Sequence, residues 1–496
     1  MSDNKYTPVS TQPVKRFFVE MLTRDIAVED AILDLLDNCV DGILRSKSLT
    51  LEQATPMESE TPVSISAENT LPYTGFWANI KVNGDRFEIQ DNCGGIPWKE
   101  HDRAFRMGRP LETPERPEDI PALSVGAYGI GMKRAIFRMG TQALISTQNG
   151  GDNYEIDISP EWIRDESNWH LDVKQSEYSM DHDGTLIIVE QLHTGVRERF
   201  SAEIFERDLI TKIESHYAVI IQKGFAVTVN NQVIDPNPIQ FRFAVEKRDG
   251  AEVRPYMFRS NIADVDIFLA IGLREPIPGV ERMLEEQTSA QFSSDFAGWT
   301  VICNDRVVLY NNRDELTGWG TAGIPQYHTQ FIAISGVVEF RGDPRQLPTT
   351  TTKRGLDFSS SIYQQVLDRM REGLRMFVSF TNQWKTHEEE ARAEVSPVPS
   401  VTYSALRRQV EAANIPFAQV RIGRPGEQYK PSLPQPISTS TAQRITYIRE
   451  KDELRKLAEE ILPDFDDLQE RDIPRRVGEE TFNFTYKHFF DGDVNK

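Results

Sequence analysis

The sequence predicts an α+β protein, built from helices and from strands that pair as hairpins. Residues 15–23 and 26–45 place apolar side chains at helical spacing. Residues 76–92 instead alternate apolar and polar side chains, like two strands joined at Asn83-Gly84. The chain has 496 residues, which is enough for two or three domains with substantial cores.

The remaining elements follow from local composition in chain order. In the first half we expect loops at 46–72 and 101–125, a helix at 131–139, strands at 142–147 and 184–192, a helix near 202–222, and a hairpin turning at Asn230-Asn231. In the second half we expect strands within 265–273, 298–310 and 331–340, a helix near 359–380, and a linker at 394–401. These patterns divide the chain into parts 1–238, 239–394 and 395–496.

Composition bounds the kinds of function. Apolar residues make up 39% and charged residues 27%, which is typical of a soluble globular protein. The net charge of −20 argues against a surface coated with cations for nucleic acid, although a local basic groove stays open. With no signal peptide and no apolar run of about 20 residues, we expect a cytoplasmic protein without a membrane partner. The three cysteines form no CxxC pair, so their spacing indicates neither a disulfide framework nor a structural zinc site.

The helix at 26–45 carries short polar residues among its apolar ones. Asp34, Asn38 and Asp41 are spaced i, i+4 and i+7, so they share one face, whereas Leu35 and Cys39 are expected in the core. Asn38 offers an amide oxygen suited to Mg²⁺, and Asp34 could act as a general base on water. A solvated helix face explains the same residues equally well when the helix is considered alone.

Three further segments favour a nucleotide site. In "IQDNCGGIP", Asp91 ends a strand and can accept the hydrogen bond of an exocyclic amine, while Gly94 and Gly95 let backbone approach a flat ligand. In "SVGAYGIGMKR", the glycines precede a helix whose N-terminus favours phosphate, and a lysine follows in its first turn. In "DHDGTLIIVE", Thr185 begins a strand and could support the base. The glycine-bearing segment contributes Gly126, Gly129, Gly131 and Lys133.

In order and spacing these segments resemble the GHKL ATPase superfamily, which includes gyrase-type topoisomerases, MutL, MORC proteins, the ATP-driven heat-shock chaperone and histidine kinases. Its helix motif matches at Asn38 and Asp41, its adenine motif at Asp91 and Gly95, its lid motif at the three glycines, and its Gly-Thr motif at Gly184-Thr185. The resemblance implies a Bergerat-type α/β sandwich that hydrolyses ATP. The resemblance also implies a role for each site residue. Asn38 binds Mg²⁺, and Asp91 accepts a hydrogen bond from the adenine amino group, with Thr185 supporting the adenine base. The lid glycines and Lys133 bind the phosphates.

Two departures from the family pattern matter. Asp34 stands where gyrase, MutL and the chaperone carry glutamate, and its shorter side chain predicts slow turnover. Asp30, one turn earlier, is a weaker alternative base. Cys93 replaces the first glycine of the adenine motif, so the local turn is expected to differ.

The segments 298–320 and 348–358 resemble the transducer domain of gyrase, MutL and MORC proteins, in which a loop lysine senses the terminal phosphate. Lys353 is the candidate and Arg354 the alternative, and an ordinary surface pair before a helix is the competing interpretation. A histidine kinase is disfavoured, because no histidine precedes Asp34. The closest resemblance is to prokaryotic MORC- and MutL-like proteins. It implies that ATP orders the lid at 101–125 and promotes homodimerisation, with residues 1–20 crossing to the second subunit.

The C-terminal part is less informative. Residues 449–462 predict an amphipathic helix, and the tail at 482–490 alternates aromatic and polar residues like an edge strand. We expect an ATP-driven dimerisation switch in DNA transactions, with anti-phage defence or restriction as the setting and effector proteins as partners; the DNA expectation comes from family analogy, not from charge. The alternatives are a chaperone-like or scaffolding ATPase that acts on protein, and a nucleotide sensor without turnover.

Overall fold

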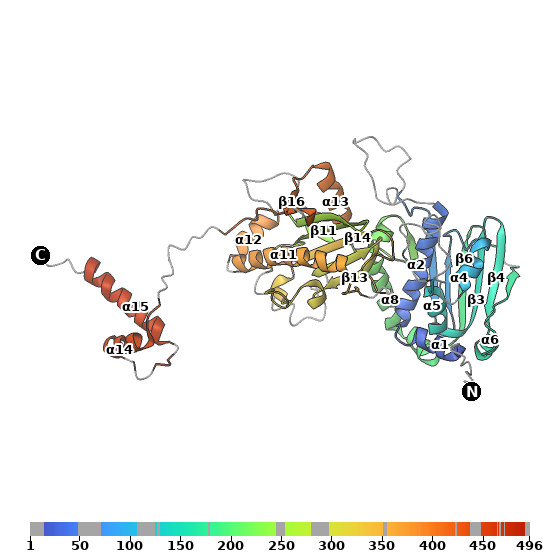
Figure 1. Ribbon diagram of the computed structural model, residues 1–496, viewed down its shortest axis with the longest axis horizontal. Helices are drawn as coiled ribbons and strands as arrows, with labels where there is room; N and C mark the ends of the chain where they lie inside the picture. The colour runs from blue at the N-terminus through green and yellow to red at the C-terminus, as the bar shows by residue number, and fades with distance from the viewer. Residues whose placement is uncertain are drawn as a thin grey trace, which may run out of the picture. The chain divides into compact units, whose positions relative to one another are not determined.

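The computed structural model contains two compact units, 1–436 and 437–496 (Figure 1). The described residues are 14–47, 71–106, 125, 129–176, 179–244, 253–278, 297–350, 355–385, 387–421, 424–436, 448–463, 465, 468–470 and 472–491. The predicted Gly126, Lys353 and Arg354 lie outside these ranges, as does most of the predicted lid.

An eight-stranded sheet forms the first half of unit 1, in the order β5-β4-β3-β6-β2-β1-β7-β8. Its strands are β1 (Trp77–Val82), β2 (Phe87–Asp91), β3 (Gly140–Asn149), β4 (Asp152–Ile158), β5 (Val173–Gln175), β6 (Gly184–Leu192), β7 (Ala226–Val229) and β8 (Gln232–Val233). The predicted hairpins are confirmed: β1 pairs antiparallel with β2 across Asn83-Gly84, and β7 pairs with β8 across Asn230-Asn231. Both asparagines of the second turn have positive φ, which Asn tolerates better than most residues.

Helices cover this sheet and complete its core. They are α1 (Lys15–Thr23), α2 (Val28–Lys47), α4 (His101–Phe105), α5 (Gly131–Met139), α6 (Pro160–Arg164), α7 (Thr194–Ser201), α8 (Glu203–His216) and α9 (Ala218–Gln222), with a 3-10 turn η1 (Trp98–Glu100). Figure 1 shows α2 and α5 side by side against the sheet, where their apolar side chains join those of β1, β2, β3 and β6 in one core. Residues 101–105 were expected in a loop and are helical instead.

Helix α1 is fixed to the same half by a buried lysine. The Nζ of Lys15, on a side chain with no exposed surface, donates to the carbonyl oxygens of Trp162 and Asp165 at 2.7 Å each. It also lies 3.9 Å from the centroid of the Trp162 ring. Residues 15–20 of the expected dimerisation arm therefore lie in a helix that packs within the chain.

A seven-stranded sheet forms the second half of unit 1, in the order β13-β12-β14-β11-β10-β17-β16. Its strands are β10 (Tyr256–Ile262), β11 (Val265–Leu273), β12 (Gly298–Cys303), β13 (Arg306–Asn312), β14 (Ile334–Arg341), β16 (Ala418–Arg421) and β17 (Arg424–Tyr429). Its helices are α11 (Ser361–Trp384), α12 (Glu388–Val395) and α13 (Tyr403–Ala412), with two 3-10 turns η4 (Glu315–Thr317) and η5 (Thr329–Phe331). A short antiparallel pair joins β9 (Gln240–Arg242) to β15 (Ser400–Thr402), whose first two residues lie within the segment 394–401 predicted as a linker.

Helices lie on both faces of this second sheet. Along β11, Ile267, Leu269 and Ile271 join the core beneath α11, whereas Phe268 and Ala270 join the core beneath α13. This division follows from the two-residue repeat of a strand, because successive side chains point to opposite faces. A near-continuous apolar strand such as β11 is what a sheet buried on both faces requires.

Buried ion pairs connect the two halves of unit 1. Asp305, in the turn between β12 and β13, accepts from Lys223 Nζ at 2.7 and 2.8 Å and from the hydroxyl of Tyr73 at 3.0 Å. The adjacent Arg306 donates to Asp37 of α2. The hairpin of β12 and β13 is thus joined by charge to the helix that carries Asn38.

Unit 2 contains α14 (Lys451–Ile461), α15 (Ile473–Tyr486) and a π-helical turn at Lys487–Asp491. The amphipathic helix is confirmed, but the edge strand expected at 482–490 is wrong. A two-residue alternation also places residues at i and i+4, and the rings of Phe482 and Tyr486 stack at that spacing, with centroids 6.1 Å apart. None of the helices in the described part of the chain has the length and apolar run that crossing a bilayer requires.

Candidate nucleotide-binding site

A cavity of about 180 Å³ lies where α2, β2, α4, α5 and β6 meet. The predicted residues that line it are Asn38, Asp41, Asp91, Gly95, Gly129, Gly131, Lys133 and Thr185. They come from four segments that are far apart in sequence, so the fold brings together most of what the sequence singled out.

Helix α2 forms one wall of the cavity. Glu29 and Asp30 lie in its first turn, and Arg45 and Lys47 lie in its last turn, an arrangement that complements the helix dipole. Asn38 is exposed although its neighbours on both sides are buried, so its amide oxygen is accessible to a ligand. Asp41 accepts the main-chain N–H of Val125 at 2.5 Å, which ties α2 to the glycine-bearing segment.

Asp91 lies at the other wall, as the last residue of β2. It pairs with Ala78 on one side and with Thr185 on the other, so the sheet register fixes its position. Its Oδ1 accepts the N–H of Cys93 at 2.8 Å. Burial raises the pKa of Asp91 to about 6, against the hydrogen bonds from Cys93, Cys39 and Thr185, which act to lower it. The carboxylate is thus largely ionised at neutral pH and can accept a hydrogen bond from a ligand.

Thr185 is buried beside Asp91, and its hydroxyl lies 3.1 Å from that of Thr147 on β3. Thr147 also accepts the N–H of Ile96, which follows the glycine pair. These contacts position the turn after β2 against the neighbouring strands.

Two glycines at the cavity have backbone conformations that other residues adopt poorly. Gly95 has φ +61°, and a Cβ placed on it would lie 2.0 Å from the carbonyl oxygen of Gln148. Gly129 has φ +67° and directly precedes the turn into α5. A residue other than glycine at 95 would therefore push the adenine-motif turn away from β3.

The N-terminus of α5 opens on the cavity through Gly131. Its first-turn N–H groups have no partner within the helix and carry the positive end of the dipole, which suits an anion such as phosphate. Lys133, in the same turn, is 2% exposed and donates to the carbonyl oxygens of Ala104 at 2.7 Å and Arg106 at 2.8 Å. In this arrangement its ammonium group joins α5 to the end of α4.

Asp34, the expected base, is not among the residues that line the cavity. Its carboxylate forms a buried ion pair with Arg134 of α5, whose Nε lies 3.2 Å from Oδ2. The alternative base, Asp30, pairs with Lys212 of α8. Each carboxylate therefore has a cationic partner that no local sequence pattern identifies.

Several residues that line the cavity were not predicted as site residues from the sequence. Arg45 lies seven residues after Asn38 on the same face of α2, a spacing that could have identified it. Glu100 and Arg103 enter from the turn and helix before the undescribed segment, and no sequence signal marked them. Cys39, expected in the core, also lines the cavity, together with Cys93.

Residues 26–185 match the family model described as "Histidine kinase-, DNA gyrase B-, and HSP90-like ATPase". The match spans about a third of the chain and contains every predicted site residue except Lys353. It supports a GHKL-type domain in this segment, with ATP binding and ATPase activity. None of the curated proteins matches the sequence.

Proposed function

We propose that the chain binds Mg·ATP in this cavity, hydrolyses it slowly, and uses it to switch between monomer and homodimer. The observation that carries the proposal is the convergence of four separated motifs on one cavity inside the matched segment. Asp91 accepts the adenine amino group, supported by Thr185, and the α5 N-terminus with Gly129 and Gly131 receives the phosphates.

The residues present fit a magnesium ion. Asn38 is accessible in the cavity and Asp41 lies one turn further along α2, so both offer oxygen donors, which Mg²⁺ prefers. When bound, the ion would neutralise part of the phosphate charge. Lys133 would add a cation once its ammonium leaves the carbonyl oxygens of Ala104 and Arg106.

Slow turnover follows from the position of Asp34. To take a proton from water, Asp34 must leave Arg134 or approach the substrate with it, and both groups are at most 6% exposed. Breaking a buried ion pair costs several kcal/mol, so a closing movement is needed to compensate. Such a movement makes hydrolysis depend on the closed state.

We place the switch in DNA transactions, with anti-phage defence or restriction as the setting and effector proteins as further partners. The support for this assignment is the resemblance of 298–320 and 348–358 to a transducer domain. Lys353 is proposed to sense the terminal phosphate; Thr349 and Leu356, described residues on either side of it in sequence, form an antiparallel bridge.

Calorimetric titration with Mg·ATP tests the proposal. Wild type should bind, whereas Asp91→Asn should lose about 10- to 100-fold in affinity, because a charged acceptor is replaced by a neutral one. Asp152→Asn, an exposed position on β4, is the matched control and should bind like wild type. An absence of both binding heat and thermal stabilisation in wild type would refute the nucleotide site.

The proposed switch between monomer and homodimer is tested separately, by measuring hydrodynamic mass. A nonhydrolysable ATP analogue should double the hydrodynamic mass of wild type and leave that of Asp91→Asn unchanged. A mobility shift of DNA only with ATP would support the DNA assignment, and turnover stimulated by protein without DNA would refute it.

A further inference from the structure

Three side chains with metal-ligating atoms meet at the base-binding end of the cavity. Cys39 comes from α2, Asp91 from the end of β2, and Cys93 from the turn that follows. One ligand atom from each lies within 4.8 Å of the other two. All three residues are buried, and all three line the cavity.

The spacing suits a tetrahedral metal ion. Zinc lies about 2.3 Å from thiolate sulfur and about 2.0 Å from carboxylate oxygen, so neighbouring ligand atoms are about 3.5–3.8 Å apart. The Sγ of Cys39 lies 3.6 Å from Oδ2 of Asp91. The other oxygen, Oδ1, accepts a hydrogen bond from the N–H of Cys93, so Oδ2 is the oxygen that contacts the Cys39 thiol.

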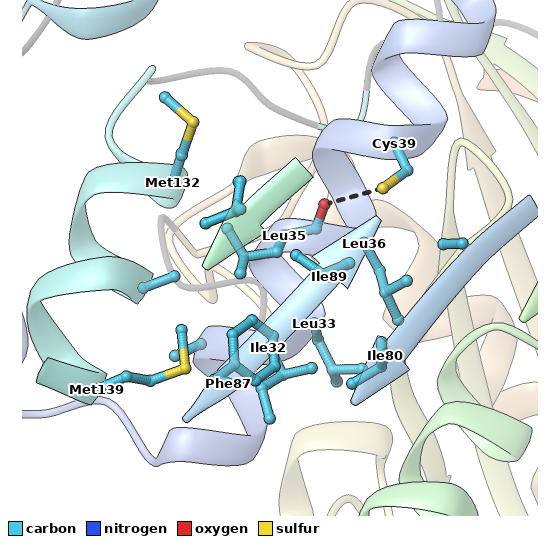
Figure 2. Packing of buried hydrophobic residues seen from close by; sticks show 14 of the residues in the cluster. Ile32, Leu33, Leu35, Leu36, Cys39, Ile80, Phe87, Ile89, Met132 and Met139 are labelled. Atoms are coloured by element: carbon cyan, nitrogen blue, oxygen red, sulfur yellow. Dashed lines mark hydrogen bonds between the residues drawn. The ribbon is translucent and has the colours of Figure 1, made fainter. Parts of the chain in front are cut away.

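The backbone keeps the two sulfur-bearing segments together. A Cβ added to Gly42 of α2 would lie 2.5 Å from the carbonyl oxygen of Cys93, so only glycine lets the helix approach this turn so closely. The present thiol contacts are weak ones: Cys39 Sγ lies 3.4 Å from the Leu35 carbonyl oxygen (Figure 2), and Cys93 Sγ lies 3.8 Å from that of Trp77. A metal would replace weak donors with strong bonds.

Buried cysteines commonly serve only as small apolar side chains. Cys303 fits that description, since it is buried in β12 and belongs to no such ligand group among the described residues. Cys39 and Cys93 differ from it because both lie beside the Asp91 carboxylate and both line the cavity.

We propose that Cys39, Cys93 and Asp91 bind a zinc ion, with the fourth coordination position open to the cavity. Each thiol gives up its proton to solvent as its sulfur binds. Because Asp91 cannot bind zinc and read adenine together, zinc antagonises nucleotide binding; this second statement rests on the proposed function.

Cobalt substitution in the metal-free full chain tests the site. Co²⁺ should produce a thiolate-to-metal charge-transfer band in wild type and in Cys303→Ser, and added zinc should remove the band. Cys39→Ser and Cys93→Ser should each weaken metal affinity by about a hundredfold or more. Absence of the band in wild type, or its persistence in both serine variants, would overturn the site.

Alkylation of wild type gives a second readout that needs no variant. Zinc should protect Cys39 and Cys93 from a maleimide and leave the labelling of Cys303 unchanged, as mass spectrometry of the peptides would report. Equal labelling of Cys39 and Cys93 with and without zinc would contradict the proposal even if the serine variants fail to fold.

The antagonism between zinc and ATP is tested by measuring ATP affinity in the presence of magnesium, once with added zinc and once without it. Zinc should weaken binding to wild type and to Cys303→Ser, but not to Cys93→Gly. A cobalt band without any loss of ATP affinity would overturn the antagonism and leave the metal site standing. A cobalt band in a chain that binds no ATP even when zinc is chelated would instead refute the proposed function.

Discussion

Arg306 donates from Nε to Oδ1 of Asp37 across 2.9 Å, and both side chains are nearly inaccessible to solvent. Asp37 directly precedes Asn38 on α2, and Arg306 begins β13 in the second half of unit 1. The hydroxyl of Tyr217 also donates to Asp37, and its ring lies 4.6 Å from the Arg306 guanidinium carbon. A displacement of the second sheet would therefore act on the helix that borders the cavity.

Replacing Arg306 should destabilise unit 1 strongly. Arg306→Met leaves Asp37 buried without its cation, which should lower the free energy of unfolding by about 3–5 kcal/mol. Arg16→Met, which removes an exposed pair with Glu20, should change it by less than about 1 kcal/mol. Urea unfolding followed by circular dichroism measures both, and equal losses in the two variants would contradict the inferred role of the buried pair.

The steric demand at Gly95 can be separated from its backbone strain. Gly95 and Gly150 have similar φ values, +61° and +58°, but an added Cβ meets Gln148 at the first and nothing within 4 Å at the second. Gly150→Ala should cost about 1–2 kcal/mol from left-handed strain alone. Gly95→Ala should cost more than about 3 kcal/mol and lower ATP affinity. Thermal melting and ATP titration of both variants measure these effects, and comparable losses would show that the approach to Gln148 is unimportant.

The base is identified by phosphate release. Asp34→Asn should slow turnover by about 10²- to 10⁴-fold while ATP affinity stays within about threefold, because general-base catalysis is lost and binding is not. Asp152→Asn should release phosphate at the wild-type rate. If Asp30→Asn slowed turnover more than Asp34→Asn did, Asp30 would be the base instead.

Acid should destabilise unit 1 through His216. Burial, followed by the charges of Arg306 and Lys212, lowers the pKa of His216 to about 3, against a hydrogen bond to the Val307 carbonyl and the charge of Asp37. Because the unfolded chain takes up this proton near its ordinary pKa of 6.5, stability is constant above that pH. Below pH 6.5 the free energy of unfolding falls by up to about 1.4 kcal/mol per pH unit, until the pH reaches the pKa of His216 in the folded state.

Urea unfolding between about pH 7 and about pH 5 measures this loss. The loss should shrink in His216→Gln and persist in His170→Gln, whose histidine is exposed. An identical pH dependence in wild type and His216→Gln would remove His216 as its source.

Local pattern was enough to predict most elements near the site. The turns at Asn83-Gly84 and Asn230-Asn231 and the helix at 131–139 are confirmed, because each depends on neighbours within a few residues. The edge strand predicted at 482–490 was wrong for the same reason, because a short alternation of aromatic residues is compatible with both a strand and a helix. The domain boundaries near 238 and 394 and the transducer assignment stay predictions.

By itself the sequence determined which residues could form a nucleotide site, because residue type and spacing fix which side chains share a helix face or end a strand. Only the tertiary structure decided how those residues are partnered. It pairs Asp34 with Arg134, holds Lys133 on the end of α4, and brings Cys39 to Asp91 and Cys93. These contacts join segments as many as 100 residues apart, so they depend on how α2, α5 and the sheet pack rather than on any local pattern.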